Sequence, residues 1–178
     1  MAVELVYETH SLTEDNEAGI ATGWLPGKLS PEGRRLAAEL GVRRRDEAVS
    51  AVFVSDLERA VETARIAFEG SGIPVFEDAR LRECNYGELN GAPVTLLAIN
   101  RAKHIDVPFP GGQSYRDVLA QTEAFLHDLL AERDGQRVLV ISHKANKWAL
   151  DCLLNGAGLE DLVDAPFGWQ EGWLYRVE

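Results

Sequence analysis

The chain has 178 residues and a hydrophobic content of 46%, which is enough for one soluble domain with a single core, so residues 1–178 are expected to form one unit. Its formal net charge of −11 argues against binding to nucleic acids, because their phosphates favour a basic protein face. No run of about 18 apolar residues occurs, so no membrane-spanning helix and no membrane partner are expected.

Strand-like and helix-like segments alternate along the chain, and this pattern favours an α/β fold. A strand over 3–7 ends shortly before His10. A helix is expected to begin with Ser30 as its N-cap and Pro31 in its first turn, and to end with Gly41 as its C-cap. The remaining predicted elements are a strand at 51–56, a helix at 57–72, a strand at 73–78, a helix at 114–135, a strand at 137–143, a helix at 145–156 and an edge strand at 172–178.

Two stretches do not fit regular elements. Residues 85–113 are rich in glycine and proline, and we expect them to form a lid-like excursion from the sheet, too short for a second domain. The basic cluster at 43–45 is expected to decorate the end of a helix.

Two histidines, His10 and His143, each come directly after a predicted strand. If both strands belong to one parallel sheet, the two imidazoles meet at its carboxyl edge, where α/β proteins place their sites. One imidazole could then attack a phosphorus atom while neighbouring cations stabilise the charge on the phosphoryl oxygens. The alternative for His10 is a polar residue in a surface loop.

An arginine and a glutamate could complete such a site. Arg59 lies in the first turn of a predicted helix, where a guanidinium can bind an anion in bidentate fashion. Glu83 lies in a glycine-containing loop and could protonate a leaving oxygen. The alternative for Arg59 is an ordinary surface arginine. The alternative for Glu83 is a structural salt bridge to Arg80 or Arg82.

These residues occur in motifs that resemble the histidine phosphatase superfamily, also called phosphoglycerate mutase-like, over nearly the whole chain. The family begins with Arg-His-Gly, followed by a serine or threonine and then an asparagine. The matching motifs, in the family's order, are THSLTEDN, TGWLPGKLSPEGRRLA, SDLERAVETA, LRECNYGELNG, GGQSYRD and VISHKAN. The resemblance implies a three-layer α/β/α sandwich with a mostly parallel central sheet and an antiparallel C-terminal edge strand.

The chain departs from the family pattern around the expected phosphate site. Thr9 stands where the family has an arginine that clamps phosphate, and Ser11 replaces the glycine after the first histidine. Lys144 replaces the glycine after the second histidine. The loss of an arginine clamp weakens phosphate binding unless another cation substitutes, and Lys144 or Lys147 could do so as a point charge.

The resemblance implies a two-step phosphoryl transfer without a metal or other cofactor. His10, Glu83 and His143 would be catalytic: His10 as nucleophile and Glu83 as the group that protonates the leaving oxygen and then deprotonates water. The residues expected to bind phosphate are Arg59, Asn16, Thr9, Ser11 and Lys144. The residues expected to bind the rest of the substrate are Thr13, Thr22 and Gly23.

Three functions fit this reading. The first is a phosphomonoester hydrolase that acts on a small phosphorylated metabolite through a phosphohistidine. The second is a phosphoglycerate mutase-type phosphotransferase, although only about thirty residues separate Glu83 from the GGQS motif, as in the phosphatases. The third is a non-catalytic or repurposed member that binds an anionic ligand, which the changes at Thr9 and Lys144 would permit.

The remaining expectations concern the cell and the assembly. Two cysteines, Cys84 and Cys152, are too few for a disulfide framework and are expected to be buried or half-buried small residues. The first residues lack the basic and apolar regions of a signal peptide, so a cytoplasmic location is expected. The chain is expected to act as a monomer or a homodimer.

Overall fold

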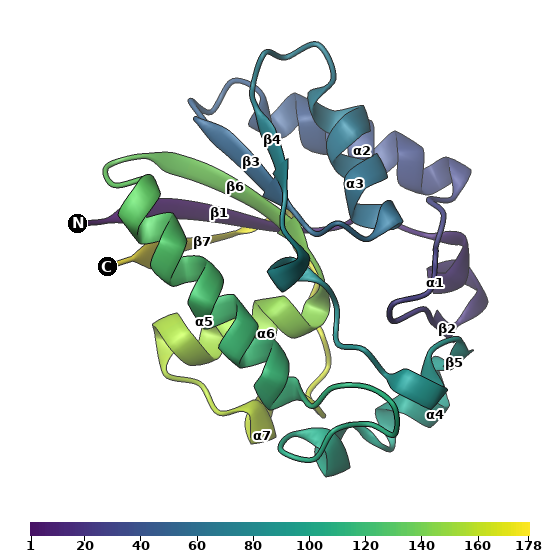
Figure 1. The fold of residues 1–178 in the computed structure, drawn as a ribbon. Helices are drawn as coiled ribbons and strands as arrows, with labels where there is room; N and C mark the ends of the chain where they lie inside the picture. The colour runs from purple at the N-terminus through teal and green to yellow at the C-terminus, as the bar shows by residue number, and fades with distance from the viewer.

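The computed structural model describes all of residues 1–178. A central sheet has the strand order β4-β3-β6-β1-β7, and helices cover both of its faces (Figure 1). The strands are β1 (Val3–Thr9), β2 (Ile20–Ala21), β3 (Ala51–Val54), β4 (Val75–Glu77), β5 (Ala92–Pro93), β6 (Arg137–Ser142) and β7 (Trp173–Val177). The α-helices are α1 (Glu14–Ala18), α2 (Pro31–Arg44), α3 (Glu58–Phe68), α4 (Val94–Ala98), α5 (Tyr115–Glu132), α6 (Lys144–Asn155) and α7 (Leu159–Leu162).

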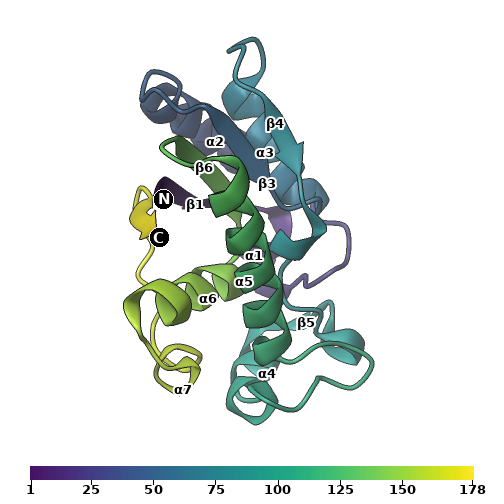
Figure 2. The same cartoon turned by 60° about the vertical axis from the view of Figure 1, so that its left-hand side comes forward.

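The sheet confirms the predicted topology. Strands β3, β4 and β6 run parallel to β1, while β7 pairs with β1 in the antiparallel direction at one edge. Successive side chains of a strand point to opposite faces of the sheet. In β6, Val138 and Val140 therefore pack toward α5, and Leu139 and Ile141 pack toward α3. Figure 2 shows the resulting three layers, with α2 and α3 on one face of the sheet and α5 and α6 on the other.

The ends of α2 show where the sequence prediction succeeded and where it failed. Ser30 is the N-cap, and its hydroxyl accepts a hydrogen bond from the amide of Gly33. Gly41, however, is not a C-cap: the helix continues to Arg44, and Gly41 is buried inside it. A Cβ there would lie 2.4 Å from the carbonyl oxygen of Ala67, so this glycine allows α2 and α3 to pack closely.

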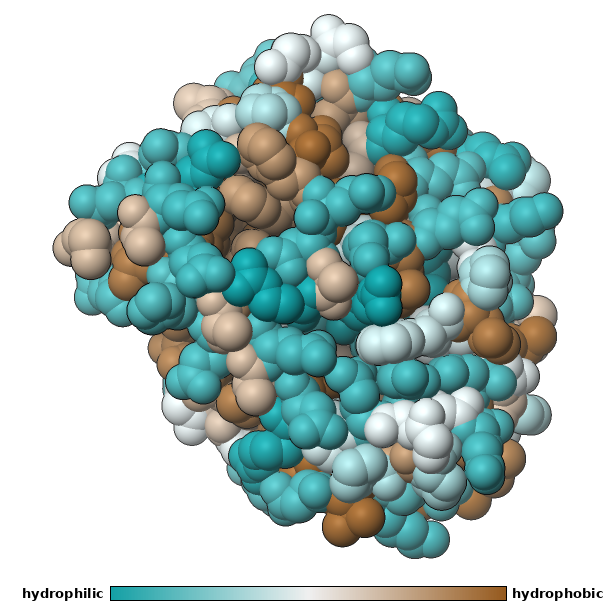
Figure 3. Space-filling model, in the orientation of Figure 1, coloured by the Kyte–Doolittle hydropathy of each residue, from teal (hydrophilic) through white to brown (hydrophobic).

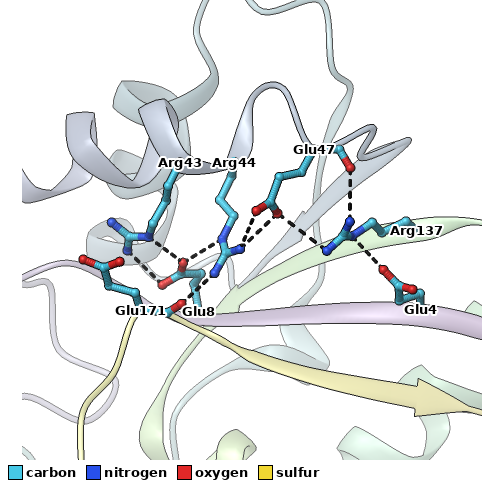
Figure 4. A network of polar contacts seen from close by, with 7 residues as sticks. All are labelled: Glu4, Glu8, Arg43, Arg44, Glu47, Arg137 and Glu171. Atoms are coloured by element: carbon cyan, nitrogen blue, oxygen red, sulfur yellow. Dashed lines mark hydrogen bonds and ion pairs between the residues drawn. The ribbon is translucent and has the colours of Figure 1, made fainter.

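The basic cluster at the end of α2 forms ion pairs with carboxylates of the central sheet and the following loop. The carboxylate of Glu8, with a side chain only 1% exposed, accepts hydrogen bonds from Arg43 Nε at 3.0 Å and Arg44 Nε at 2.9 Å. Arg44 also bonds Glu47, which lies within ion-pair distance of Arg137 on β6. Figure 4 shows this network, which ties α2 to two central strands. The predicted position of the cluster at the end of a helix is confirmed, and Arg43 and Arg44 in addition bind the buried carboxylate of Glu8.

The lid-like excursion at 85–113 packs against the body of the protein. It contains two 3₁₀ helices, η2 (Gly87–Leu89) and η3 (Arg101–His104), together with β5 and α4. A further 3₁₀ helix, η1 (Ala79–Leu81), precedes it. Within the excursion, Leu97, Ile105 and Phe109 are buried in a second apolar cluster with Trp148 of α6. In Figure 1 the excursion extends away from the sheet at the end where β2 and α1 lie.

The face shown in Figure 3 is largely hydrophilic, and its hydrophobic residues form separate patches rather than one continuous band. None of the helices combines the length and the apolar composition that a membrane span requires.

Candidate active site

The two histidines meet at the carboxyl edge of the sheet, because β1 and β6 are neighbours in parallel register. Thr9 pairs with Ser142, so the next residue of each strand is a histidine. The backbone amide of His10 donates to the carbonyl of Ser142 at 2.9 Å. The ring centroids of His10 and His143 are 5.1 Å apart, at an interplanar angle of 55°.

The environment of His10 determines which of its nitrogens is free. Nδ1 lies 2.7 Å from the carbonyl oxygen of Ser11, and because a carbonyl only accepts, Nδ1 carries the proton. The lone pair of Nε2 is then left for chemistry, in a side chain that lines a cavity. Burial and the nearby charge of Arg59 lower the pKa of His10 to about 3, so the imidazole is neutral at pH 7. His10 therefore has the protonation state of a nucleophile.

The loop after His10 is fixed by hydrogen bonds of Ser11. Its amide donates to Thr63 Oγ1 at 3.0 Å, and its hydroxyl donates to the carbonyl of Gly33 at 2.6 Å. Both donors are thus engaged within the protein, although Ser11 lines the cavity. The structure gives Ser11 the role of holding the loop, and we leave it out of the phosphate-binding set.

Arg59 presents a buried cation to the cavity. It is the second residue of α3 and is 3% exposed. Its Nη2 donates to the carbonyl of Gly23 at 2.8 Å, whereas its buried Nη1 has no hydrogen-bond partner. Burial lowers the pKa of Arg59, and the charge of Glu83 opposes this effect. Since a buried unpaired donor is costly, Nη1 is well suited to bind an anion.

Glu83 is free of the salt bridges that its sequence neighbours allowed. Arg80 pairs with Asp78, and Arg82 pairs with Asp56 at 2.6 Å, so neither arginine neutralises Glu83. One oxygen of Glu83 accepts from the amide of Cys84 at 2.7 Å. The side chain is 8% exposed and lines the cavity near His10 and Arg59. This position suits a group that exchanges a proton with a bound substrate.

His143 lies behind His10 and does not itself line the cavity. It is fully buried, with Nε2 located 2.8 Å from Ser55 Oγ and with Nδ1 lacking a partner. Burial, together with the charges of Arg59 and His10, lowers the pKa of His143 well below its ordinary value. Its carbonyl accepts a hydrogen bond from the hydroxyl of Tyr7, which anchors the start of α6.

The other predicted binding residues divide into two groups. Asn16, Thr22 and Gly23 line the cavity, and the amide nitrogen of the Asn16 side chain is free because only its oxygen is used to cap α1. Thr13 lies outside the cavity: it is completely buried and caps α1 by accepting from the amide of Asn16. We therefore assign Thr13 to the support of the loop and not to substrate binding.

The structure separates the two lysines that could replace the missing arginine. Lys147 forms an ion pair with Asp151 at 2.6 Å and does not line the cavity. Lys144 lines the cavity together with Thr9 and forms no ion pair; its Nζ lies 5.1 Å from the ring centroid of Phe167. Burial and the charge of Arg101 lower the pKa of Lys144, while Glu83 raises it. Lys144 is thus the lysine within reach of a bound anion.

The cavity measures about 600 Å³, which is larger than a phosphate group needs and typical of a site for a small metabolite. Besides the residues above, the residues that line it include Tyr86, Leu97, Arg101, Trp148, Phe167, Trp169, Glu8, Leu36, Glu39, Leu40, Arg43 and Glu171. None of the sequence patterns identified Arg101, Trp148, Phe167 or Trp169 as cavity residues. Nothing in their spacing distinguishes them from core or surface residues. No group of three or more histidine, cysteine, aspartate or glutamate side chains is placed to hold a metal ion.

Comparisons with known proteins agree with this geometry. A family model of the histidine phosphatase superfamily (branch 1) matches residues 9–175. The 2,3-bisphosphoglycerate-dependent phosphoglycerate mutase of Cytophaga hutchinsonii is 30% identical over 97% of this chain and 86% of its own. A candidate phosphoserine phosphatase of Hydrogenobacter thermophilus is 30% identical over 86% of this chain and 79% of its own.

Among solved structures, YhfR of Bacillus stearothermophilus superimposes with a TM-score of 0.86, at 25% identity over 99% of this chain and 91% of its own. The family match includes His10, Arg59 of α3, the loop with Glu83, and β6 with the following His143. The chain belongs to the histidine phosphatase superfamily, branch 1.

Proposed function

We propose that the protein is a phosphomonoester hydrolase that acts through a phosphohistidine at His10 on a small phosphorylated metabolite. The observation that carries this proposal is the position of the His10 imidazole in the cavity, with its Nδ1 2.7 Å from the carbonyl oxygen of Ser11. That bond leaves Nε2 free, and Arg59, with its unpartnered Nη1, and Glu83 line the same cavity.

In the first step, Nε2 of His10 attacks phosphorus while the bond from phosphorus to the leaving alcohol oxygen breaks. Glu83, in its carboxylic acid form, gives its proton to that oxygen. The phosphorylated imidazole is cationic, and the Ser11 carbonyl stabilises it by accepting from Nδ1. Arg59, Lys144 and the amide nitrogen of Asn16 hold the phosphoryl oxygens.

In the second step, water replaces the alcohol. The Glu83 carboxylate takes a proton from water as the water oxygen bonds to phosphorus, and the bond from phosphorus to Nε2 breaks. Inorganic phosphate leaves, and both His10 and Glu83 return to their starting protonation states. His143 remains neutral behind His10 and fixes the position of α6 and its first residue, Lys144.

The test uses His10→Asn, because the amide nitrogen of asparagine can still donate to the Ser11 carbonyl while Nε2 is lost. The wild type, incubated with an aryl phosphate and quenched at alkaline pH, should gain the mass of one phosphoryl group in an acid-labile linkage. His10→Asn should remain unmodified and lose turnover by at least about a thousandfold. A wild type that turns over substrate without any such adduct, or a variant that keeps its rate, would overturn the assignment.

A phosphotransferase is the second candidate, and the phosphoglycerate mutase among the relatives favours it. A mutase returns the phosphoryl group to an organic acceptor, whereas a hydrolase passes it to water. The short segment between Glu83 and residue 111 supports the hydrolase. Release of one inorganic phosphate for each ester consumed supports hydrolysis, and isomerised product without free phosphate supports transfer.

A further inference from the structure

The segment that carries Glu83 is held by side chains and not by a regular element. Glu83 lies between η1 and η2, outside every helix and strand, so no ladder of backbone hydrogen bonds fixes its position. Three consecutive carbonyl oxygens of this segment accept hydrogen bonds from side chains instead. The Ser142 hydroxyl donates to Leu81, the Asn146 side-chain amide donates to Arg82 at 3.1 Å, and the Trp24 indole Nε1 donates to Glu83 at 2.6 Å.

Trp24 is the donor that reaches Glu83 itself. It is half-buried in the loop between β2 and α2, whereas the other two donors belong to β6 and α6. Trp24 does not line the cavity, although its neighbours Thr22 and Gly23 do. An effect of this side chain on the reaction therefore has to pass through Glu83.

The bond from Trp24 acts on the same peptide group that orients the carboxylate. The carbonyl of Glu83 and the amide of Cys84 belong to one peptide unit, which is planar and moves as one body. Its oxygen accepts from the Trp24 indole, and its N–H donates to the Glu83 carboxylate at 2.7 Å. A rotation of this peptide would break the first bond and turn the second away from the carboxylate. The indole thus determines where the carboxyl group lies in the cavity.

Trp24 is itself fixed by two arginines. The carbonyl of the preceding residue, Gly23, accepts from Nη2 of Arg59 at 2.8 Å. The guanidinium carbon of Arg82 is 4.6 Å from the centroid of the indole, and Arg82 also bonds both carboxylate oxygens of Asp56. This loop therefore connects the cation expected to bind phosphate with the expected proton donor.

We propose that Trp24 is a positioning residue for proton transfer: its indole N–H fixes the peptide between Glu83 and Cys84, and that peptide holds the Glu83 carboxyl group in place for the leaving oxygen. The inference rests on the proposed function, because it takes Glu83 as the group that exchanges the proton. Since only a poor leaving group needs that proton, the effect of Trp24 should depend on the ester.

The test uses Trp24→Phe, which removes the N–H donor and keeps an aromatic ring for the guanidinium of Arg82. Trp173→Phe is the matched control, because it makes the same change at a half-buried tryptophan of β7 outside the cavity. Both substitutions are made in the wild type and in Glu83→Gln. The measurements are kcat and KM for propyl phosphate and for p-nitrophenyl phosphate.

Trp24→Phe should lower kcat for propyl phosphate by about tenfold or more and for p-nitrophenyl phosphate by less than about threefold, with KM changed by less than about twofold. In the Glu83→Gln background it should change neither kcat by more than about twofold, because the group through which it acts is gone. Trp173→Phe should leave the ratio of the two kcat values unchanged. Equal losses for the two esters, or a loss that persists in Glu83→Gln, would assign Trp24 a purely structural role and refute the inference.

A second measurement tests the hydrogen bond without turnover and without a variant. In the wild type, the indole N–H of Trp24 should exchange with D2O at least about tenfold more slowly than that of Trp169, which is 59% exposed, as followed by NMR. Equal exchange rates would refute the inference even if Trp24→Phe does not fold. A wild type that hydrolyses neither ester refutes the proposed function and the role of Trp24 together, whereas hydrolysis with equal losses in Trp24→Phe refutes the role of Trp24 alone.

Discussion

The carboxyl group of Glu83 makes one hydrogen bond, to the amide of Cys84, and forms no ion pair with an arginine. If it donates the proton to the leaving oxygen, Glu83→Gln should slow alkyl phosphates much more than aryl phosphates, whose leaving groups need little protonation. We expect about a hundredfold or greater loss of kcat for alkyl esters and a much smaller loss for p-nitrophenyl phosphate. Equal losses for both classes would assign Glu83 a structural role.

Lys144 lines the cavity together with Thr9, which stands at the position of the missing arginine, and it makes no ion pair that would hold it elsewhere. Lys144→Ala should therefore raise KM for simple alkyl phosphates by about tenfold with a smaller change in kcat. Thr9→Arg, in the Lys144→Ala background, should recover part of that loss because Thr9 lines the same cavity. Lys147→Ala is the control, since Lys147 pairs with Asp151 away from the cavity. An unchanged KM in Lys144→Ala would remove Lys144 from the phosphate site.

At this scale the sequence predicted residue types better than it predicted contacts. The motifs around His10 and His143 identified both imidazoles, because a strand end fixes where the following side chain can lie. The proton on Nδ1 of His10 could not be predicted, since it depends on the direction of a single carbonyl. Arg101 was missed because its cavity position arises from the irregular path of 85–113 and not from a repeating pattern.

At the scale of elements, the two glycines of α2 have different tasks. A Cβ at Gly33 would lie 1.8 Å from the carbonyl oxygen of Leu12, next to the loop that holds His10, and one at Gly41 would lie 2.4 Å from that of Ala67. We expect both Gly33→Ala and Gly41→Ala to lower the free energy of unfolding by about 1–3 kcal/mol, through steric overlap with the backbone.

Only Gly33→Ala should also reduce kcat, by about tenfold or more, because a small displacement of the nucleophile strongly lowers the rate of its attack. Denaturant unfolding and steady-state kinetics on the two variants measure both effects. The same kcat for the two variants would mean that the contact of α2 with the His10 loop does not position the nucleophile.

The main elements were predictable because their signals are local. Apolar runs marked β1, β3 and β6, and Ser30 with Pro31 marked the start of α2. The end of α2 was not predictable, because Gly41 is required by the backbone of Ala67, a tertiary contact that leaves no mark in the local pattern. The role of Arg43 and Arg44 likewise depends on Glu8, which is distant in sequence and adjacent only in the fold.

For the whole molecule, the buried neutral histidine makes stability depend on pH. In the unfolded chain the imidazole of His10 has its ordinary pKa of 6.5, and in the folded protein the pKa is about 3. Between pH 3 and pH 6.5 the imidazole of His10 is protonated in the unfolded chain and neutral in the folded protein. The contribution of His10 to the free energy of unfolding therefore falls as the pH drops below 6.5 and is unaffected above it. By linkage, His10 alone removes up to about 2 kcal/mol at pH 5 relative to pH 7.

Urea unfolding at pH 7 and pH 5 measures this loss. His10→Asn should lose less stability on acidification than the wild type, because the group that takes up the proton on unfolding is absent. His127→Asn, a substitution at an exposed histidine of α5, should lose as much as the wild type. If His10→Asn and His127→Asn respond alike, the folded imidazole of His10 titrates near its ordinary value.

The strand order also determines when the nucleophile can be put in place during synthesis. Strand β1 is made first, but its two neighbours in the sheet, β6 and β7, are both made last. Until residues 137–177 have left the ribosome, β1 is an apolar strand with two unpaired edges, a state that invites pairing with other chains. Contacts of such large sequence separation also form slowly. A nascent chain that already contains His10, Arg59 and Glu83 therefore has no assembled site, and its first strand needs protection until the last quarter of the chain arrives.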